Sequence, residues 1–485
     1  MPRRDSKQLG AYYTPPEVVR CLVSWVSAGI GDGSILDPSC GDGRFLEGME
    51  NAVGVDIDPA AAKAAAQGTR ATIVREDFFS WVRRSNRRFA GAVGNPPFIR
   101  YHRFNGDGRR RALQYCVAQG VRLSGLCSSW APFIVGATSL LHKGGRIAFV
   151  VPAEIGHAVY AKPVLRHLLS SFERVEIIAV REKLFPELSE DCWLLRASGF
   201  GRRGEVAYFA KLDSFDPRDD RWVFEPVPIA EIERWHYRLR PFLVDRAVRD
   251  AYGALADQPG TIRLGDVGNI GIGYVTGAND FFHLRPSTAA QLGIPDDLLR
   301  VSVRSNRDLA VDDVDEELVA SWLRDDRPVL LLDLRGVDDL PRAVTDYLES
   351  PGGRVARRAY KCRTRRPWFV VPQVRVPDAF LSIMAGGTPR LVRNSAGVSC
   401  TNSVHAVSLT NGLDLGRVTT RWNGPLTAFS CELEGHALGG GLLKIEPAEA
   451  RRVMLALDVD LSDEEADLMA NGVRELRRWR NADAT

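Results

Sequence analysis

The sequence has no cysteine pattern of the kind that indicates a metal centre or a disulfide scaffold. Its 485 residues include eight cysteines, which are scattered singly, with no CxxC pair and no His/Cys cluster at zinc spacing. We therefore expect reduced, mostly buried thiols and no bound metal.

Long apolar runs are also missing. No stretch approaches the roughly 20 residues of a membrane-spanning helix, and the charged segment Met1–Ser6 leads into no apolar signal core. Hydrophobic residues make up 45% of the chain and charged residues 26%, which is typical of a soluble globular protein. These absences predict a cytoplasmic protein without a membrane partner.

A strong net charge is the third absence, because the formal charge is only +3. The basic residues are nevertheless clustered. Seven cations and no acid occur between positions 354 and 366, namely Arg354, Arg357, Arg358, Lys361, Arg363, Arg365 and Arg366. Tyr360 lies among them, and cations interleaved with aromatic rings suit a nucleic-acid backbone. A solvated charged surface is the alternative interpretation of this cluster.

Two phosphate-binding patterns, GxGxxG and GxxxxGK[ST], do not occur, which disfavours a dinucleotide or a nucleoside triphosphate as the ligand. Instead, Ser34–Leu46 predicts a short strand, an acidic turn and then a helix. The turn contains Asp37, Gly41 and Gly43. Glycines allow a close approach of the backbone to a ligand, and carboxylates accept hydrogen bonds from it. Such a turn suits a cationic ligand better than a phosphate.

Acidic residues also end the next two predicted strands. The first ends at Asp56, which lies 19 residues after Asp37. A carboxylate at about this distance holds the ribose hydroxyls in nucleoside-binding sheets. The second leads into Asp77 and Phe78, which can accept a hydrogen bond from an adenine amine and pack on the adenine ring.

The tetrapeptide Asn95-Pro96-Pro97-Phe98 follows a short apolar strand. Two consecutive prolines cannot continue a strand ladder, and they restrict the backbone where it leaves the sheet. In open α/β sheets, ligands bind at such strand ends. The Asn95 side-chain oxygen and the Pro96 carbonyl can accept two hydrogen bonds from an –NH2 group on a flat ring, and Phe98 offers that ring a face. A Pro-Pro loop without chemistry is the alternative.

The order of the predicted elements indicates two domains. Strands and helices alternate as far as about residue 180, and the strand Cys192–Ala197 then follows without a crossover helix, so it should be antiparallel. We expect a doubly wound α/β sheet with helices on both faces. Past about Arg240, short runs broken by Gly, Pro, Asn and Asp predict a mixed α+β domain. The predicted domains are 1–245 and 246–485.

The first helix has a local start signal. Thr14 is a favourable N-cap, a proline occupies the first helical position, and Glu17 completes a capping box. We therefore expect the Thr14 hydroxyl to cap this helix.

Taken in order, the segments Thr14-Pro15-Pro16, Asp37–Gly43, Asp56-Ile57-Asp58, Asp77-Phe78 and Asn95–Phe98 resemble the motifs of N6-adenine DNA methyltransferases of the TaqI type, the γ class. The resemblance is close over residues 9–210 and looser beyond, although Gly435–Pro447 also resembles the C-terminal part of that family. It implies a class I methyltransferase sheet, S-adenosylmethionine (SAM) as the cofactor, and a C-terminal target-recognition domain that binds double-stranded DNA.

The resemblance also implies roles for the matched residues. For SAM, the methionine part is matched by Thr14, Asp37, Gly41 and Gly43, the ribose by Asp56, and the adenine by Asp77, Phe78 and Phe133. For the target adenine, the two acceptors of the amine are matched by Asn95 and the Pro96 carbonyl. Phe98 stands where many members have Tyr, and Phe185 resembles a second aromatic ring that packs on the flipped base.

The implied activity is methylation of the N6 amine of an adenine flipped out of duplex DNA, in a restriction-modification or similar defence system. A separate restriction endonuclease as partner and a monomer on DNA fit this interpretation. Alternatives are an RNA adenine N6-methyltransferase, a protein-glutamine methyltransferase and a catalytically silent DNA-recognition subunit. The large second domain argues against the first two, and the intact Asn-Pro-Pro-Phe segment argues against the third.

Overall fold

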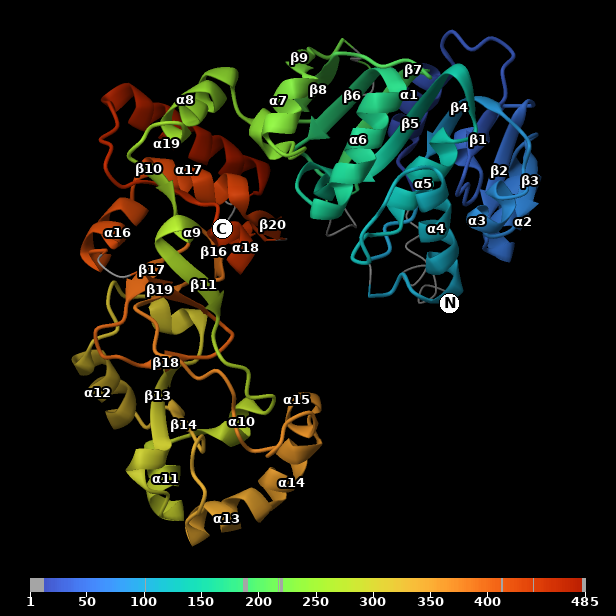
Figure 1. Cartoon of the computed structure of the whole chain (residues 1–485). Coiled ribbons are helices and arrows are strands. Elements are labelled where there is room, and N and C mark those ends of the chain that lie inside the picture. Colours follow the sequence, from blue (N-terminus) through green and yellow to red (C-terminus); the bar gives the residue numbers. More distant parts are fainter. Residues whose placement is uncertain are drawn as a thin grey trace. The chain divides into compact units, whose positions relative to one another are not determined.

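The computed structural model describes residues 13–100, 102–185, 191–216, 218, 221–410, 413–438 and 440–481. The chain forms two compact units, Met1–Leu243 and Val244–Thr485 (Figure 1). None of the helices in the described ranges combines the length and the apolar character needed to cross a membrane.

The first unit is built on a nine-stranded sheet with the order β3-β2-β1-β4-β5-β7-β6-β8-β9. Its strands are β1 (Ile35–Asp37), β2 (Ala52–Asp56), β3 (Thr72–Arg75), β4 (Phe89–Gly94), β5 (Leu141–Pro152), β6 (Phe172–Val180), β7 (Cys192–Phe200), β8 (Val206–Leu212) and β9 (Glu225–Pro228). Strands β1 to β5 run parallel to one another, whereas β7 lies antiparallel between β5 and β6. The predicted doubly wound sheet with an antiparallel strand is confirmed, and β8 and β9 extend it further.

Helices cover both faces of this sheet. They are α1 (Pro16–Ser27), α2 (Pro59–Gly68), α3 (Phe78–Val82), α4 (Gly106–Ala118), α5 (Trp130–Thr138), α6 (Lys162–Ser171) and α7 (Ile229–Arg234). Figure 1 shows α5 and α6 in front of the sheet, where they pack on β5 and β6. Five consecutive residues of β5, Ile147–Val151, are completely buried. Because successive side chains of a strand point to opposite faces, this continuous burial requires cover on both sides.

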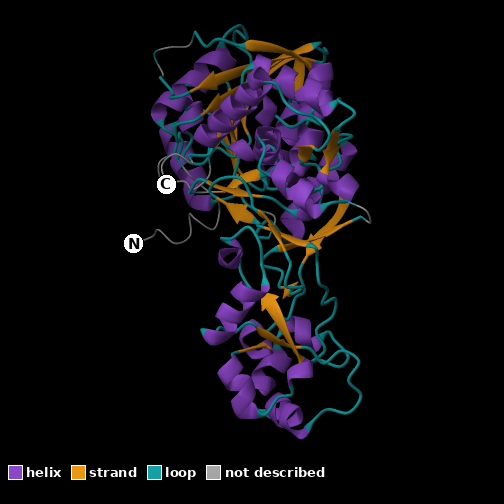
Figure 2. Ribbon diagram, turned by 90° about the vertical axis from the view of Figure 1, so that its left-hand side faces the viewer, coloured by secondary structure: helices purple, strands orange, loops and turns teal. Residues whose placement is uncertain are grey.

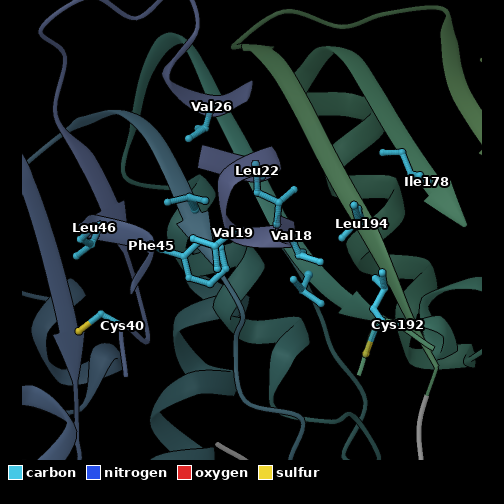
Figure 3. Packing of buried hydrophobic residues seen from close by; sticks show 14 of the residues in the cluster. Val18, Val19, Leu22, Val26, Cys40, Phe45, Leu46, Ile178, Cys192 and Leu194 are labelled. Atoms are coloured by element: carbon cyan, nitrogen blue, oxygen red, sulfur yellow. The ribbon is translucent and has the colours of Figure 1, made fainter. Parts of the chain in front are cut away.

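Helix α1 supplies the apolar side chains for one of these contacts. Val18, Val19, Leu22 and Val26 recur at helical spacing and are buried in the same cluster as Ile178 of β6 and Leu194 of β7. Figure 3 shows these residues between the helix and the strands. The apolar stripe therefore attaches the N-terminal segment, with Thr14 at its start, to the central sheet.

The predicted capping of α1 by Thr14 is wrong. The helix begins at Pro16, its N-cap is Pro15, and no side chain caps it. The hydroxyl of Thr14 instead accepts a hydrogen bond from the side chain of Asn95. A contact with a residue 81 positions away has replaced the local one, and two prolines at the start leave fewer helix N–H groups to be capped.

The second unit combines short strands with helices (Figure 2). Its strands are β10 (Thr261–Arg263), β11 (Gly268–Ile272), β12 (His283–Leu284), β13 (Leu299–Val303), β14 (Leu330–Leu332), β15 (Ala379–Leu381), β16 (Met384–Ala385), β17 (Leu391–Arg393), β18 (Ser399–Cys400), β19 (His405–Leu409), β20 (His436–Leu438), β21 (Leu442–Lys444) and β22 (Met454–Ala456). They form small sheets in the orders β10-β22, β11-β19-β15-β17, β12-β14-β13-β18 and β16-β21-β20.

The helices of this unit are α8 (Arg246–Ala256), α9 (Leu264–Val267), α10 (Asn279–Phe282), α11 (Pro286–Leu292), α12 (Glu316–Arg324), α13 (Arg342–Glu349), α14 (Pro351–Arg358), α15 (Tyr360–Arg363), α16 (Leu415–Trp422), α17 (Pro425–Glu434), α18 (Pro447–Ala450) and α19 (Asp463–Trp479). The last of them has acidic residues in its first turn and basic residues in its last. Its N-cap Ser462 forms a capping box with Glu465.

Replacing Leu22 with Ala should destabilise the first unit, because the side chain of Leu22, a residue of α1, is completely buried. Removing a buried leucine typically lowers the free energy of unfolding by about 2–5 kcal/mol. Urea unfolding followed by circular dichroism measures the change. The control is Arg20→Ala, on the exposed face of the same helix, which should shift the unfolding free energy by no more than about 0.5 kcal/mol. Equal effects of the two variants would contradict the packing described here.

Candidate functional site

Three predicted site residues lie at one edge of the central sheet. Strands β2, β1 and β4 are adjacent and parallel, so their carboxyl ends meet at the same edge. Asp56 ends β2, Asp37 ends β1, and Asn95 directly follows β4. The topology therefore brings together a carboxylate pair and an amide from three separate strands.

Asp37 is completely buried at the centre of this edge. Its Oδ1 accepts a hydrogen bond of 3.0 Å from the N–H of Ser39, whereas its Oδ2 has no hydrogen-bond partner within the described part of the chain. Burial raises the pKa of this carboxyl to about 8, and the charges of Asp56 and Asp42 act in the same direction. The site thus contains an electronegative, unsatisfied oxygen.

The close approach of β4 to Asp37 requires glycine at position 94. A Cβ atom there would lie 2.6 Å from Asp37 Oδ1, well inside van der Waals contact. With glycine, the strand passes directly against the carboxyl group, and Asn95 emerges beside it. The apolar segment that precedes the Asn-Pro-Pro-Phe tetrapeptide therefore has a spatial role as well as a strand-forming one.

Asp56 is held by the glycine-containing turn. Its two oxygens accept hydrogen bonds of 2.8 Å from the N–H groups of Gly41 and Asp58. Burial raises the pKa of Asp56 despite these two bonds. Gly43 has a φ of 87°, and a Cβ atom there would lie 2.7 Å from the Thr69 side chain, so only glycine fits the turn against α2.

A polar network fixes the orientation of the Asn95 amide. Its Nδ2 donates to the hydroxyl of the buried Thr14 at 3.1 Å. Arg44 then donates to the Thr14 carbonyl at 2.6 Å and forms a two-pronged ion pair with Asp42. Sequence reasoning did not identify Arg44 or Asp42, although an Asp-x-Arg pair inside the glycine-containing turn was a visible signal.

Asp77 lies at the start of α3 and caps it through a bond of 2.9 Å from the Ser80 N–H. Its Oδ1 also accepts from Arg111 Nε at 3.1 Å. Arg111 belongs to α4, so this ion pair joins the start of α3 to the helix that follows the Asn-Pro-Pro-Phe segment. Arg111 belongs to a run of basic residues and gave no separate signal in the sequence.

The two aromatic residues predicted beside the cofactor adenine lie directly on each other. The rings of Phe78 and Phe133 are 5.3 Å apart between centroids at an interplanar angle of 15°, which is direct stacking contact. No third ring fits between them. Phe78 is buried, and Phe133 keeps part of its surface exposed. Ile57 directly follows Asp56, and 61% of its surface is exposed.

The two aromatic residues predicted beside the target base differ in exposure. Phe98 is half-buried and packs at the edge of the α1 cluster. Phe185 is a member of the same cluster and is only 5% exposed. Pro186, the neighbour used for its assignment, lies outside the described residues. Of the two residues, Phe98 keeps more of its surface exposed.

The basic residues of the second unit lie on α14 and α15 and in the segment that follows. Six are exposed, namely Arg354, Arg357, Arg358, Lys361, Arg363 and Arg366. Arg365 differs, because it is half-buried and its guanidinium donates to carbonyls of a distant segment, those of Thr276, at 2.7 Å, and of Val275. Burial lowers the pKa of Arg365. It joins α15 to the segment between β11 and α10, a structural role that the sequence did not reveal.

No group of three or more His, Cys, Asp or Glu side chains in the described ranges is arranged to hold a metal ion. The eight cysteines are thiols rather than disulfides, and seven of them are buried.

Comparison with known proteins identifies two families along the chain. Residues 2–195 match the family described as N-6 DNA Methylase, and residues 237–484 match the C-terminal domain of the Type II methyltransferase M.Eco57I. The Type II methyltransferase M.XamI of Xanthomonas campestris pv. amaranthicola is 25% identical over 92% of this chain and 85% of its own length. M.AccI of Acinetobacter calcoaceticus is 18% identical over 97% and 89%.

The fold also has a counterpart among solved structures. The Type IIL restriction-modification enzyme MmeI, in complex with DNA, superimposes with a TM-score of 0.55 over 99% of this chain and 76% of its own. The two sequences are 11% identical, so the likeness concerns the fold.

The raised pKa of Asp37 predicts a pH dependence of stability in protein freed of bound small molecules. The folded state keeps a proton up to about pH 8 that the unfolded state releases near pH 4. Stability should therefore fall as the pH rises through this window. Asp37→Asn removes this titration. The unfolding free energy of the variant minus that of the wild type should therefore increase between about pH 5 and about pH 8.

Urea unfolding at both pH values measures the effect of Asp37→Asn. Asp32→Asn, at an exposed carboxyl, is the control and should follow the wild type. If Asp37→Asn and the control show the same pH dependence, Asp37 does not titrate in this range.

Proposed function

Because the chain belongs to the N6-adenine DNA methyltransferases of restriction-modification systems, with a C-terminal domain of the M.Eco57I type, we propose that it methylates an adenine flipped out of duplex DNA. SAM is the proposed methyl donor. The observation that carries the proposal is the convergence of Asn95 with Asp37 and Asp56 at one sheet edge. An amide acceptor for the amine and carboxylates for a cationic nucleoside are thereby adjacent.

The residues at this edge fit SAM chemically. A cation beside the buried Asp37 Oδ2 would supply the missing partner and lower the pKa of that carboxyl, and SAM carries an ammonium and a sulfonium. When bound, SAM supplies an electrophilic methyl group. Each oxygen of Asp56 accepts one backbone bond and retains a lone pair for a ribose hydroxyl.

The adenine of SAM has a separate set of proposed contacts. Asp77 accepts from its amine. The N–H of Phe78, at the first position of α3, has no acceptor within the helix and can donate to a ring nitrogen. Phe133 offers a ring face, while the buried Phe78 supports Phe133 from below. In this arrangement Phe78 contributes its backbone rather than its ring.

Asn95 and Pro96 act on the target amine. The lone pair of an adenine amine is delocalised into the ring, which makes its nitrogen a poor nucleophile. Accepting its two hydrogens favours a more tetrahedral nitrogen with an available lone pair, and the fixed position of both acceptors supplies the alignment. The Pro96 carbonyl accepts no hydrogen bond from the described residues. Thr14 binds the amide nitrogen of Asn95, which orients the oxygen as the acceptor.

Phe98 compensates for the loss of stacking when the base leaves the duplex. Extruding a base costs a few kcal/mol, and stacking on one aromatic ring returns about 1–3 kcal/mol. The half-buried position of Phe98 supports this role. The burial of Phe185 favours a supporting position in the cluster below, so its direct contact with the base stays a prediction.

DNA phosphates are the proposed partners of the exposed cations on and after α14 and α15. Phosphate contacts give sequence-independent affinity and set the register of the protein on the duplex. Arg365 is omitted from this set, because it is half-buried and its guanidinium bonds to two carbonyls of a distant segment. A separate endonuclease with the same sequence specificity and a monomeric state on DNA stay predictions.

Methyl transfer from tritiated SAM to plasmid DNA, followed by sequencing of modified bases, tests the proposed function. N6-methyladenine at a defined recognition sequence is the expected result. Label in RNA or in peptide glutamine, with none in DNA, would overturn it in favour of the corresponding alternative. Absence of transfer to all three despite SAM binding would identify a silent recognition subunit.

Asn95→Ala and Asp56→Ala should separate chemistry from cofactor binding. Asn95→Ala should abolish turnover and leave SAM affinity nearly intact, because Asn95 serves the target amine. Asp56→Ala should chiefly weaken SAM binding, at roughly 1.5–3 kcal/mol for each charge-assisted bond removed. Calorimetric titration with SAM, run beside the tritium assay, measures both effects. Retained turnover in Asn95→Ala would refute its acceptor role, and unchanged SAM affinity in Asp56→Ala would refute the ribose assignment.

Replacing Arg357, Arg358 and Arg363 together with Ala should weaken binding to cognate and non-cognate DNA alike. The slope of log affinity against log salt should fall by roughly three, about one for each arginine that no longer neutralises a phosphate. SAM affinity should not change. A matched control removes three exposed arginines elsewhere in the second unit, Arg246, Arg342 and Arg474. Equal effects of the two triple variants would show that DNA binding depends on total positive charge and not on this cluster.

A further inference from the structure

Ser129 is a buried serine whose hydrogen bonds lie on both sides of Phe98. It is 1% exposed and occupies the N-cap position of α5. Its hydroxyl donates to the Pro97 carbonyl and accepts from the Ile99 N–H at 2.9 Å. Its own N–H donates to the Ile99 carbonyl at 3.0 Å. Two of these hydrogen bonds hold the peptide groups that flank Phe98, and the third holds the next peptide group along the chain.

These bonds matter because Phe98 lies in a segment without regular secondary structure. The prolines at positions 96 and 97 restrict their own φ angles but not the backbone of Phe98. Within the described residues, the Ser129 hydroxyl is the group that bonds both to the carbonyl preceding Phe98 and to the N–H following it. The direction of the Phe98 side chain therefore depends on this hydroxyl.

Trp130, the residue after Ser129, is itself held by hydrogen bonds. Trp130 is completely buried, and its Nε1 donates at 2.9 Å to Glu154 Oε1 and to the Tyr160 hydroxyl. Glu154 belongs to the short helical turn Ala153–Gly156 that directly follows β5, and Tyr160 to the next turn, Val159–Ala161. Ser129 is thereby fixed to the end of the central sheet, close to where the Asn-Pro-Pro-Phe segment leaves β4.

We propose that Ser129 is a positioning residue for base flipping, which holds the Phe98 ring where an extruded adenine stacks. The inference rests on the proposed function, because it assumes that Phe98 receives the base. Ser129 does not touch the reactants and acts through the backbone on either side of Phe98. A misplacement of about 1 Å at a reacting group can cost about 100-fold in rate, so the loss of a single hydroxyl is expected to affect turnover.

Ser129→Ala tests the proposal, with Thr138→Val as the matched control. Thr138 is a completely buried residue of the same helix, and its hydroxyl donates only to the Ile134 carbonyl within that helix. We expect Ser129→Ala to lower kcat by about 10- to 100-fold, with SAM affinity within about twofold of the wild type. Thr138→Val should leave kcat within about twofold of the wild type. Rates are measured on plasmid DNA and divided by the number of SAM-binding sites titrated in each preparation, so misfolded protein does not count.

A double-mutant cycle with Phe98→Ala decides whether Ser129 acts through Phe98. In the Phe98→Ala background, Ser129→Ala should lower kcat by no more than about twofold, because the ring that it positions is gone. Ser129→Thr, which keeps the hydroxyl, should recover part of the rate. The inference would be overturned if the two substitutions lowered kcat independently, so that their fold-changes multiply in the double variant. It would also be overturned if Ser129→Thr lowered kcat as much as Ser129→Ala.

The same variants distinguish failure of the inference from failure of the proposed function. Wild-type turnover in Phe98→Ala would show that the base does not rely on this ring, and the proposed stacking role would fall. A low rate in Phe98→Ala together with a wild-type rate in Ser129→Ala would leave the proposed function in place and remove only the positioning role of Ser129.

Discussion

The close approach of β4 to Asp37 is the constraint on which the site depends. Gly94 is the last residue of β4, and a side chain there would collide with the Asp37 carboxyl. Because the strand passes so closely, Asn95 emerges next to the carboxylates that are proposed to hold the cofactor. The same proximity makes the burial of Asp37 unfavourable for folding stability, since its Oδ2 has no hydrogen-bond partner in the described part of the chain. The same geometry supports the proposed binding of a cationic cofactor.

Hydrogen bonds from residues outside the strands hold the site residues whose side chains the sheet does not orient. Thr14 and Arg44 tie the Asn95 amide to the glycine-containing turn, and Arg111 ties α4 to Asp77. Each connects segments that are distant in the chain. The proposed acceptor amide and the proposed adenine contact of the cofactor are thus each held by hydrogen bonds from distant segments.

Much of the first unit followed from the sequence, because its signals are local. Short apolar runs ending in acids predicted β1, β2 and β3, and the missing crossover helix before Cys192 predicted the antiparallel strand. The capping prediction for Thr14 failed because a distant partner replaced a local one: its hydroxyl accepts a hydrogen bond from Asn95 instead of capping the helix. Nothing in the sequence indicated that Arg365 bonds to two carbonyls of another segment.

The sequence by itself determined the chain order of strands β1 to β7 and the identity of the residues at their ends, because each motif consists of adjacent residues. Only the tertiary structure decided which side chains remain available to a ligand. Phe133 rather than Phe78, and Phe98 rather than Phe185, keep exposed ring surface, and Ser129 reaches the backbone beside Phe98 from a distant part of the chain. Burial and long-range hydrogen bonds depend on how elements pack, and no local pattern carries that information.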